Sequence, residues 1–518
     1  MTTIKSNLHI TLIRPPMITS KNNILFTKGI PPLGLAYIAG ALEKHDIEYS
    51  LIDGIGTRIN STYHVFDKNL ILRGMTFTEI INMIPSSTTF IALSLMFTNE
   101  WVLHKILIQK IKKRFPHKVI IVGGEHATSS WREILTQTPE IDFCVLGEGE
   151  QTLIELLKAL DSDTKITVPG VAHREQGVPI RTLNRERIRN INSLSCSWKK
   201  IPVSSYLNEG SGMNILNRRS MPILASRGCP YKCTFCSSPQ MWGTQYYTRS
   251  PVEIVAEMQS LIQKYNVEHF DFTDLSTTVN REWTQTFCDE MISKNLNVTW
   301  QFGPGTRSEV LTPDLIEHLK QANIYRLTLS PESGSSKTVK RIKKNINLTA
   351  LFNKVKLAKK QGIIIKLQFI MGLPGQTFFE MLASASYIIK LAWARVDDIS
   401  IFLYYPYPGS EIAEELVQKK IFFSDEEYSQ MELSRIGATG GIPNKQILEH
   451  NKIILTLFSF GLMILCQILT YLRSPARIFE SIYLILIKKP KRTGEMYLLT
   501  KLQSFSNPAH IQIKSNQL

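Results

Sequence analysis

The stretch Ser226-Arg-Gly-Cys-Pro-Tyr-Lys-Cys-Thr-Phe-Cys-Ser237 decides how the rest of the chain is interpreted. Its three cysteines, Cys229, Cys233 and Cys236, follow the spacing C-x3-C-x2-C directly after the apolar run 222–225. Three thiolates on one short loop can hold three corners of a cubane cluster and leave the fourth iron without a protein ligand. Clusters that only carry electrons usually have every iron ligated. The spacing therefore predicts a [4Fe-4S] cluster whose open iron binds a substrate or a cofactor.

Two other interpretations of the cysteines stay open. A tetrahedral zinc site would need a fourth ligand at suitable spacing, and no further Cys or His lies close by in the sequence. Short motifs also arise by chance, so three cysteines clustered in a loop with no metal are the second alternative.

The stretch resembles the signature loop of the radical S-adenosylmethionine (SAM) superfamily, including Phe235 before the last cysteine. The resemblance implies that the open iron chelates the amino and carboxylate groups of SAM. One electron from the cluster then cleaves SAM to a 5′-deoxyadenosyl radical, which abstracts hydrogen from the substrate. In such a site the cofactors carry the chemistry, and the protein supplies position and exclusion of water.

Composition limits the class of protein. A chain of 518 residues is long enough for two to four domains. The four other cysteines, Cys144, Cys196, Cys288 and Cys466, are scattered singly, which is no disulfide framework, and a thiolate-held cluster needs a reducing compartment. Residues 1–7 are polar and carry no signal-peptide core. We expect a cytoplasmic protein.

The net charge of +16 has two explanations. It indicates an anionic partner such as nucleic acid, phospholipid or an acidic substrate. Solvated lysines on helix faces, such as those at 110–113 and 354–360, explain it equally well. A nucleic-acid-binding protein would interleave aromatic residues with its basic patches, and the sequence shows no such interleaving. We therefore expect no nucleic-acid partner.

The first 160 residues alternate short apolar strands with helices. Such alternation predicts a doubly wound, Rossmann-like parallel sheet, whose ligands sit at the carboxyl ends of the strands. No G-x-G-x-x-G follows the first strand, which argues against a dinucleotide. The expected strands cover 8–13, 49–52, 90–95, 119–122 and 143–146, and the expected helices cover 32–43 and 101–115.

The turns after these strands resemble the cobalamin-binding domain found ahead of many radical SAM domains. The motifs are Ile30-Pro-Pro-Leu-Gly-Leu-Ala-Tyr37, Val122-Gly-Gly-Glu-His-Ala-Thr128 and Leu146-Gly-Glu-Gly-Glu150. Glycines let backbone approach a flat macrocycle closely. The cobalamin contacts that the resemblance implies are Gly123, Gly124, His126, Gly147, Glu148 and Glu150.

His126 lies in the second of these motifs. The pattern D-x-H-x-x-G, whose histidine ligates cobalt in methionine-synthase-like proteins, is absent, which implies cobalamin without a His ligand on its lower face. We place His126 near the corrin and not on the cobalt. The alternative is a loop histidine with a satisfied local hydrogen bond, which is the commoner case.

Residues 206–415 alternate strand and helix a second time. Six strands, at 222–225, 269–273, 298–302, 326–329, 363–370 and 399–403, predict a partial (β/α)6 TIM-type barrel with its active site at the carboxyl ends of the strands. The radical SAM resemblance covers this span. The SAM contacts that it implies are Phe235, Glu332, Ser333, Gly372 and Gly375.

Several positions depart from the family pattern or have simpler explanations. Asp274 lacks the usual paired acid, and strand four ends in Ser-Pro-Glu at 330–332, which puts SAM contacts of Asp274 and Arg307 in doubt. Glu332 is also explained as a charge at a helix N-terminus, and Gly372 and Gly375 as turn formers. No catalytic side chain is identified.

The remaining segments are a connection and a helical end. Residues 161–205 are expected to form a linker or small adapter with solvated arginines. Residues 416–518 are expected to be helical, with Ile453–Leu472 free of charge over twenty residues and a second apolar run, 478–487, that ends in Lys488 and Lys489. A membrane-surface anchor and a helical pair that closes the barrel are equally favoured, and a spanning helix less so.

The order of the two domains resembles the B12-binding, or cobalamin-dependent, radical SAM family over most of the chain. The commonest reaction that this implies is methylation of an unactivated carbon, with methylcobalamin as the donor. The alternative is a radical cyclase of the anaerobic magnesium-protoporphyrin type. The resemblance further implies an external reductant of the flavodoxin or ferredoxin type and a small-molecule, lipid or peptide substrate between the cofactors. The oligomeric state stays open.

Overall fold

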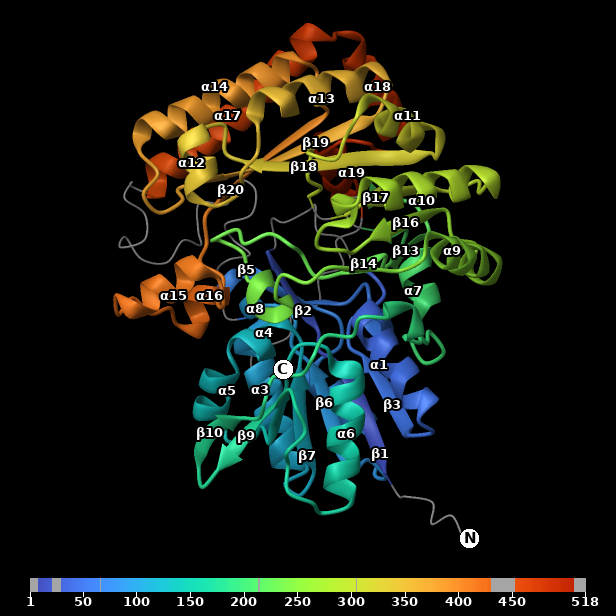
Figure 1. Ribbon diagram of the computed structural model, residues 1–518, viewed down its shortest axis with the longest axis vertical. Helices are drawn as coiled ribbons and strands as arrows, with labels where there is room; N and C mark the ends of the chain where they lie inside the picture. Colours follow the sequence, from blue (N-terminus) through green and yellow to red (C-terminus); the bar gives the residue numbers. More distant parts are fainter. Residues whose placement is uncertain are drawn as a thin grey trace.

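The computed structural model describes residues 8–20, 29–65, 67–212, 215–303, 305–429 and 452–506. The polar residues 1–7, on which the expectation of no signal peptide rests, lie outside the described residues. Two α/β units lie end to end, with the N-terminal sheet at one end and the barrel at the other (Figure 1).

The N-terminal unit is the expected doubly wound sheet. Its strand order is β10-β9-β8-β7-β6-β1-β3, and the parallel strands are β1 (His9–Arg14), β3 (Glu48–Asp53), β6 (Phe90–Ser94), β7 (Val119–Gly123) and β8 (Phe143–Val145). One face packs on α1 (Leu33–Lys44) and α6 (Gly149–Asp161). The other packs on α2 (Phe77–Met83), α3 (Trp101–Arg114) and α5 (Trp131–Gln137). Because both faces are covered, the central strands are apolar throughout.

The connection at 161–205 is more than a linker. Strands β9 (Val171–Glu175) and β10 (Val178–Arg181) form a hairpin that adds two antiparallel strands to the edge of the sheet. Gln176 and Gly177 both have positive φ, as a two-residue type I′ turn requires. The expectation of solvated arginines is also wrong for Arg187, whose Nε donates to Glu148 at 2.8 Å.

A second feature that the sequence did not indicate is a small antiparallel sheet. It consists of β2 (Met17–Ser20), β5 (Asp67–Arg73) and β4 (Thr62–Val65) in that order. The strand β2 follows Pro15 and Pro16 directly.

The second unit is the expected partial barrel. Six strands pair in sequence order and all are parallel: β13 (Ser220–Ile223), β16 (His269–Phe272), β17 (Thr299–Phe302), β18 (Ile324–Glu332), β19 (Ile364–Met371) and β20 (Asp398–Leu403). Its helices are α9 (Pro251–Tyr265), α10 (Arg281–Ser293), α11 (Pro313–Gln321), α13 (Leu348–Lys360) and α14 (Phe378–Trp393). The core between strands and helices is aromatic, with Phe272, Phe287 and Trp300 in edge-to-face contact.

The inner face of the barrel is polar. Asp271 accepts hydrogen bonds from Ser220 at 2.6 Å and from Gln301 at 2.7 Å, and Ser330 donates to Gln368 at 2.8 Å. These side chains alternate along the strands with the apolar residues that pack on the helices. The inner layers of an ordinary TIM barrel are filled by branched apolar residues. This polar face is therefore suited to holding a polar molecule.

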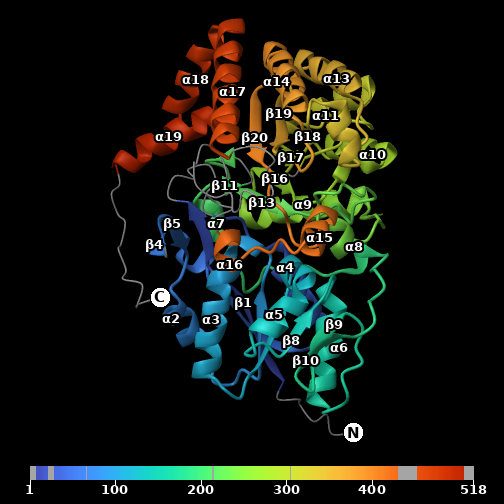
Figure 2. The ribbon, with the colours of Figure 1, turned by 90° about the vertical axis from the view of Figure 1, so that its left-hand side faces the viewer.

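The C-terminal region has three long helices where the sequence indicated two: α17 (Lys452–Arg473), α18 (Ala476–Leu486) and α19 (Thr493–Ser506). They lie together along one side of the barrel, with α17 packed against α14 and β20 (Figure 2).

Short elements complete the described fold: α4 (Glu125–Ser129), α7 (Val203–Asn208), α8 (Ser238–Trp242), α12 (Ser336–Arg341), α15 (Glu411–Gln418), α16 (Asp425–Ser429), β11 (Ser211–Gly212), β12 (Ile215–Leu216), β14 (Ser226–Arg227) and β15 (Tyr247–Thr248).

Candidate functional site

The cysteine loop begins at the carboxyl end of β13 and runs from β14 into α8. Its base is anchored by Asp274, whose buried carboxylate accepts hydrogen bonds from the backbone N–H of Ala225 at 3.0 Å and from the Ser226 hydroxyl at 2.5 Å. Burial raises the pKa of Asp274 to about 6. Asp274 therefore anchors the base of the cysteine loop.

The three thiols of the loop are suited to a cluster. The Cys236 N–H donates to the Cys233 carbonyl at 3.1 Å, which holds the loop in a turn. Burial raises the pKa of Cys233 to about 11, and the nearby cations of Lys344 and Arg307 oppose that shift. The free thiols are therefore protonated at neutral pH, and thiolates at this place need the positive charge of bound metal.

Among the residues that the structure describes, no three His, Cys, Asp or Glu side chains converge on a point where one metal ion would bind. The thiolates of a cubane bind separate irons, so the chemistry of the donor set fits a [4Fe-4S] cluster held by Cys229, Cys233 and Cys236.

A buried group of charges lies beside the loop. Glu332 ends β18 with φ of 64°, an uncommon conformation for a residue with a Cβ, and its carboxylate pairs with Lys344 Nζ at 2.9 Å. Arg307 donates to the Lys344 carbonyl at 2.6 Å, and its guanidinium lies 3.7 Å from the centroid of the Tyr231 ring. Strain at a buried charge marks functional sites. Lys344 was not singled out in the sequence, because nothing in its neighbourhood distinguishes it from a surface lysine.

The other residues expected to contact SAM are placed differently from one another. Phe235 packs with Leu373 and Tyr404, below Lys344. Gly372 and Gly375 both have positive φ in the turn after β19, which is the conformation that calls for glycine. The Ser333 hydroxyl is engaged with that of Ser384 on α14 at 2.7 Å, so it is turned away from the loop.

A cavity of about 190 Å3 lies at the carboxyl ends of β1, β6, β7 and β8. Gly124 has φ of 113°, and a Cβ there would lie 2.5 Å from the Leu95 carbonyl, so only glycine fits. The cavity is mostly apolar and glycine-lined, which suits part of a large, flat macrocycle such as cobalamin. Of the expected cobalamin contacts, the cavity is lined by Gly123, Gly124, Gly147, Glu148 and Glu150, and the barrel unit adds Arg227, Met241 and Trp242.

His126 does not line this cavity. It is buried under the sheet end, where its Nδ1 lies 3.1 Å from the Thr98 hydroxyl and its ring lies 5.2 Å from that of Trp101. Burial lowers the pKa of His126 to about 3 and that of its buried neighbour His104 to about 4. His126 is therefore better described as a buried histidine with a local hydrogen bond than as a residue beside the corrin.

The two histidines predict an acid sensitivity of the N-terminal unit. In the unfolded chain a histidine has a pKa of about 6.5, so the unfolded state binds more protons below that pH. The contribution of each buried histidine to the free energy of unfolding is fully present above about pH 6.5. It falls as the pH drops and is smaller by about 2 kcal/mol per histidine at pH 5. Urea denaturation of the cofactor-free protein at pH 7 and pH 5 measures the loss.

The double variant His104→Gln/His126→Gln should lose less stability between these two pH values than the parent protein. The exposed His45→Gln serves as the matched control and should behave as the parent. An equal pH dependence in parent and double variant would contradict the burial argument.

The cavity and the cysteine loop are joined by buried ion pairs. Arg227, two residues before Cys229, donates to Glu148 at 3.1 Å and also to Glu150. Arg187 adds a contact to Glu148, and Ser237, directly after Cys236, donates to Glu125. The carboxyl ends of the two sheets therefore face each other. The carboxylates of Glu148 and Glu150 are occupied by arginines and join the two units. Arg227 was missed, since an arginine in a loop carries no distinguishing pattern.

Comparison with protein families identifies both units. The family model described as the B12 binding domain matches residues 26–157, and the model of the radical SAM superfamily matches residues 223–388. The matches leave the helical C-terminal region uncovered and fall on the sheet with the glycine-lined cavity and on the barrel with the cysteine loop.

Three known proteins illustrate the similarity. An anaerobic magnesium-protoporphyrin IX monomethyl ester cyclase from Cereibacter sphaeroides is 28% identical over 407 residues, which span 77% of this chain and 62% of the cyclase. An uncharacterized methyltransferase from Pyrococcus horikoshii is 26% identical over 421 residues, which span 80% of this chain and 85% of that protein. The fold matches the radical SAM methyltransferase TsrM from Kitasatospora setae, solved with cobalamin and a [4Fe-4S] cluster, with a TM-score of 0.64 at 14% identity over 89% of this chain and 90% of TsrM.

Proposed function

The chain carries a B12-binding domain ahead of a radical SAM domain and belongs to the cobalamin-dependent radical SAM enzymes, and from this premise we propose that it methylates an unactivated carbon of its substrate. The observation that carries the proposal is the buried contact of Arg227 with Glu148 and Glu150. It places the cysteine loop beside the glycine-lined cavity, so that a substrate between them lies within reach of both cofactors. Methyl transfer by this route needs that juxtaposition.

The residues of this chain have definite tasks in such a reaction. Cys229, Cys233 and Cys236 would hold the cluster, and the glycine-lined cavity would hold part of the cobalamin. When bound, the cluster and SAM supply the hydrogen-abstracting radical, and cobalamin supplies the methyl group. The apolar walls of the cavity would exclude bulk water from the cofactor site.

The charges beside the loop are suited to SAM. Lys344 and Arg307 are buried cations within the electrostatic range of the cysteines, and a carboxylate is the anionic group of SAM. We infer that they favour the carboxylate end of SAM at the cluster.

A radical cyclase is the second candidate, because the Cereibacter relative is named as one. The match extends over 62% of that cyclase but over 85% of the Pyrococcus methyltransferase, which favours methyl transfer. A cyclase forms 5′-deoxyadenosine and methionine from SAM and transfers no methyl group. Only the methyltransferase therefore also forms S-adenosylhomocysteine.

The test is anaerobic reconstitution with iron, sulfide and cobalamin, followed by incubation with SAM, a reductant and a substrate-containing extract. A methyltransferase uses one SAM as the radical source and a second as the methyl source. We expect both 5′-deoxyadenosine and S-adenosylhomocysteine, in amounts that rise together. Deoxyadenosine that rises with the extract while S-adenosylhomocysteine stays at background would favour the cyclase.

We further infer a cytoplasmic enzyme that takes electrons from an external one-electron donor of the flavodoxin or ferredoxin type and acts on a small molecule. The apolar C-terminal helices would bring it to a membrane surface, because much of their outer face is uncovered.

A further inference from the structure

The outer face of α17 is apolar and exposed. Its inner face packs into the barrel core through Leu455, Leu462 and Cys466, at intervals of seven and four residues. The opposite face has no protein cover in the described structure. Exposed on it are Ile453, Ile454, Leu457, Phe460, Ile464, Leu465, Ile468 and Leu472, with Ile453 at 66% and Leu472 at 68%.

The next two helices extend the apolar face. On α18, Phe479 is 76% and Leu486 is 74% exposed, and Ile478, Ile482 and Tyr483 are exposed with them, as is Ile487 directly after the helix. On α19, Tyr497, Leu498 and Leu502 are exposed. The helices lie together at one side of the molecule (Figure 2). Large exposed apolar side chains gathered on neighbouring helices of a folded protein mark an interaction site.

The 21 residues Ile453–Arg473 of α17 are long and apolar enough to cross a membrane by length and composition. Its packing argues against a spanning position. Leu455, Leu462 and Cys466 belong to the same core as the barrel strands, so removing the helix would open the edge of the barrel at β20. A helix with one face fixed on protein and one face apolar instead lies in the plane of a membrane surface.

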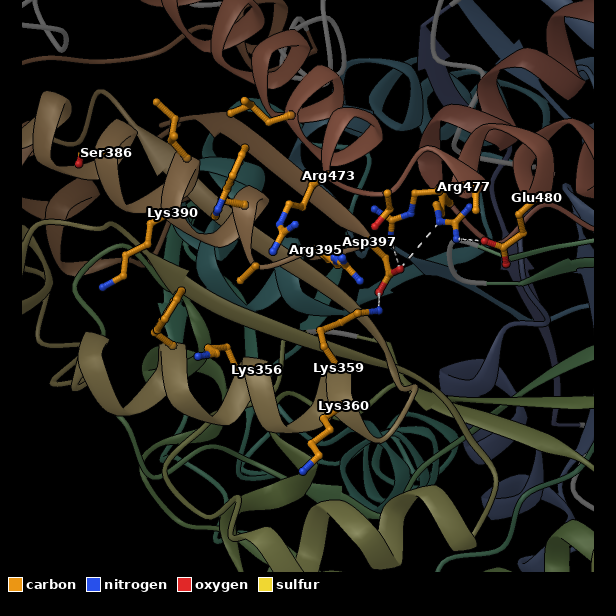
Figure 3. A pocket seen from close by; sticks show the side chains of 18 residues that line it. Lys356, Lys359, Lys360, Ser386, Lys390, Arg395, Asp397, Arg473, Arg477 and Glu480 are labelled. Atoms are coloured by element: carbon orange, nitrogen blue, oxygen red, sulfur yellow. Dashed lines mark hydrogen bonds and ion pairs between the residues drawn. The ribbon is translucent and has the colours of Figure 1, made fainter.

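A basic cleft adjoins this face. It measures about 1130 Å3 and lies between α13, α14, α17 and α18 (Figure 3). Arg473 and Arg477 line it from the same two helices that carry the apolar face. Its basic lining residues are Lys356, Lys359, Lys360, Lys390, Arg395, Arg473, Arg477 and Arg492, against two acidic residues, Asp397 and Glu480.

The two carboxylates neutralise only the deeper cations. Asp397 pairs with Lys359 and Arg477, and Glu480 pairs with Arg492. Five other cations of the lining have no carboxylate partner among the described residues: Lys356, Lys360, Lys390, Arg395 and Arg473. Aromatic rings support two of these, since Lys390 Nζ lies 4.4 Å from the Phe352 centroid and the Arg473 guanidinium 5.4 Å from that of Trp393. The cleft therefore carries uncompensated positive charge suited to anions.

The cleft does not belong to the catalytic site. Asp397 directly precedes β20, and Lys359 and Lys360 end the helix that leads into β19, so the cleft lies at the amino ends of these strands. The cysteine loop and Glu332 lie at the opposite, carboxyl ends. Its cations are therefore available for a separate ligand.

We propose that α17, α18 and α19 with the basic cleft form a docking surface for an anionic phospholipid bilayer. The apolar faces enter the boundary between headgroups and acyl chains, and the cleft receives lipid phosphates. Arginine binds phosphate oxygens in bidentate fashion, and a basic patch near anionic lipid adds attraction for each charge. Apolar area and uncompensated charge on the same helices are the complementarity that such a surface requires. The inference stands independently of the reaction at the catalytic site.

Flotation of the reconstituted holoenzyme with vesicles tests the proposal. Vesicles of phosphatidylcholine alone are compared with vesicles that also contain phosphatidylglycerol, at low and high salt. We expect binding to the mixed vesicles, weakened by salt. The cleft variant Lys390→Glu/Arg473→Glu should bind the mixed vesicles at least about tenfold more weakly. The face variant Phe479→Glu/Leu486→Glu should lose binding to the mixed vesicles.

Matched controls change the same kinds of side chain elsewhere. Lys113→Glu on α3 and Val178→Glu on β10 are exposed and should bind as the parent protein does. Cleavage of SAM by the variants in vesicle-free solution should equal that of the parent, which shows that they are folded. Failure of the parent to float, or equal binding by cleft variant and controls, would overturn the proposal. A dimer in light scattering that Phe479→Glu/Leu486→Glu dissolves, without flotation of the parent, would assign the face to a second copy instead.

Discussion

Replacing Cys233 by alanine should abolish cluster assembly and all cleavage of SAM. The thiol lies in the middle of the loop, and without it only two thiolates remain to hold a cubane. After anaerobic reconstitution we expect the iron content to fall to background, the visible absorption of the cluster to disappear and no 5′-deoxyadenosine to form.

The matched control for this variant is Cys196→Ala. Cys196 is a free, half-buried cysteine outside the loop, so the control loses a thiol of similar exposure. It should bind iron and cleave SAM as the parent does. A Cys233→Ala protein that still assembled a cubane and produced deoxyadenosine would show that the loop is not the ligand set.

Replacing Arg227 by methionine should uncouple the two halves of the site. The arginine is buried, and its removal leaves the buried carboxylates of Glu148 and Glu150 without one of their charge partners. Breaking a buried ion pair in this way costs about 3–5 kcal/mol. Because the cysteine loop itself keeps its ligands, we expect SAM cleavage to survive in part while formation of S-adenosylhomocysteine falls by roughly a hundredfold, as for misplaced reactants.

Two further variants separate position from stability. The triple variant Arg227→Met/Glu148→Gln/Glu150→Gln removes the unpaired charges and should recover part of the lost free energy of unfolding without recovering methyl transfer. Arg185→Met is the control, since Arg185 pairs with the half-exposed Glu155 inside one unit and its loss should cost about 1 kcal/mol or less. An Arg227→Met protein that formed S-adenosylhomocysteine and 5′-deoxyadenosine in the same ratio as the parent would refute the positioning role of Arg227.

The sequence predicts the strands and both carboxyl-end faces because their signals are local. Apolar runs that end in glycine or polar turns, such as Val122-Gly-Gly124, mark each strand and its ligand end together. The cysteine loop is equally local, since all three ligands lie within eight residues. The hairpin of β9 and β10 was missed because its strands are short and half-polar, although Gln176-Gly177 is the kind of turn that joins such strands.

The contacts between the two units could not be predicted in this way. Glu148 was expected beside cobalamin and lines the cavity, but its carboxylate also accepts from Arg187 and Arg227, which are distant in the sequence. Lys344 belongs to the site only because the chain turns back beside the cysteine loop after β18. Pairing of this kind depends on tertiary structure, and periodicity carries no information about it.

We propose that the cysteine loop and the glycine-lined cavity form one site for two metal cofactors. Diffraction from crystals of the reconstituted enzyme at the iron and cobalt absorption edges tests it most directly. We predict an iron peak ligated by Cys229, Cys233 and Cys236 with no fourth protein ligand, and a cobalt peak beside Gly123 and Gly147, on the side that Arg227 faces. A fourth protein ligand on the iron, or cobalt bound away from this cavity, would contradict the account.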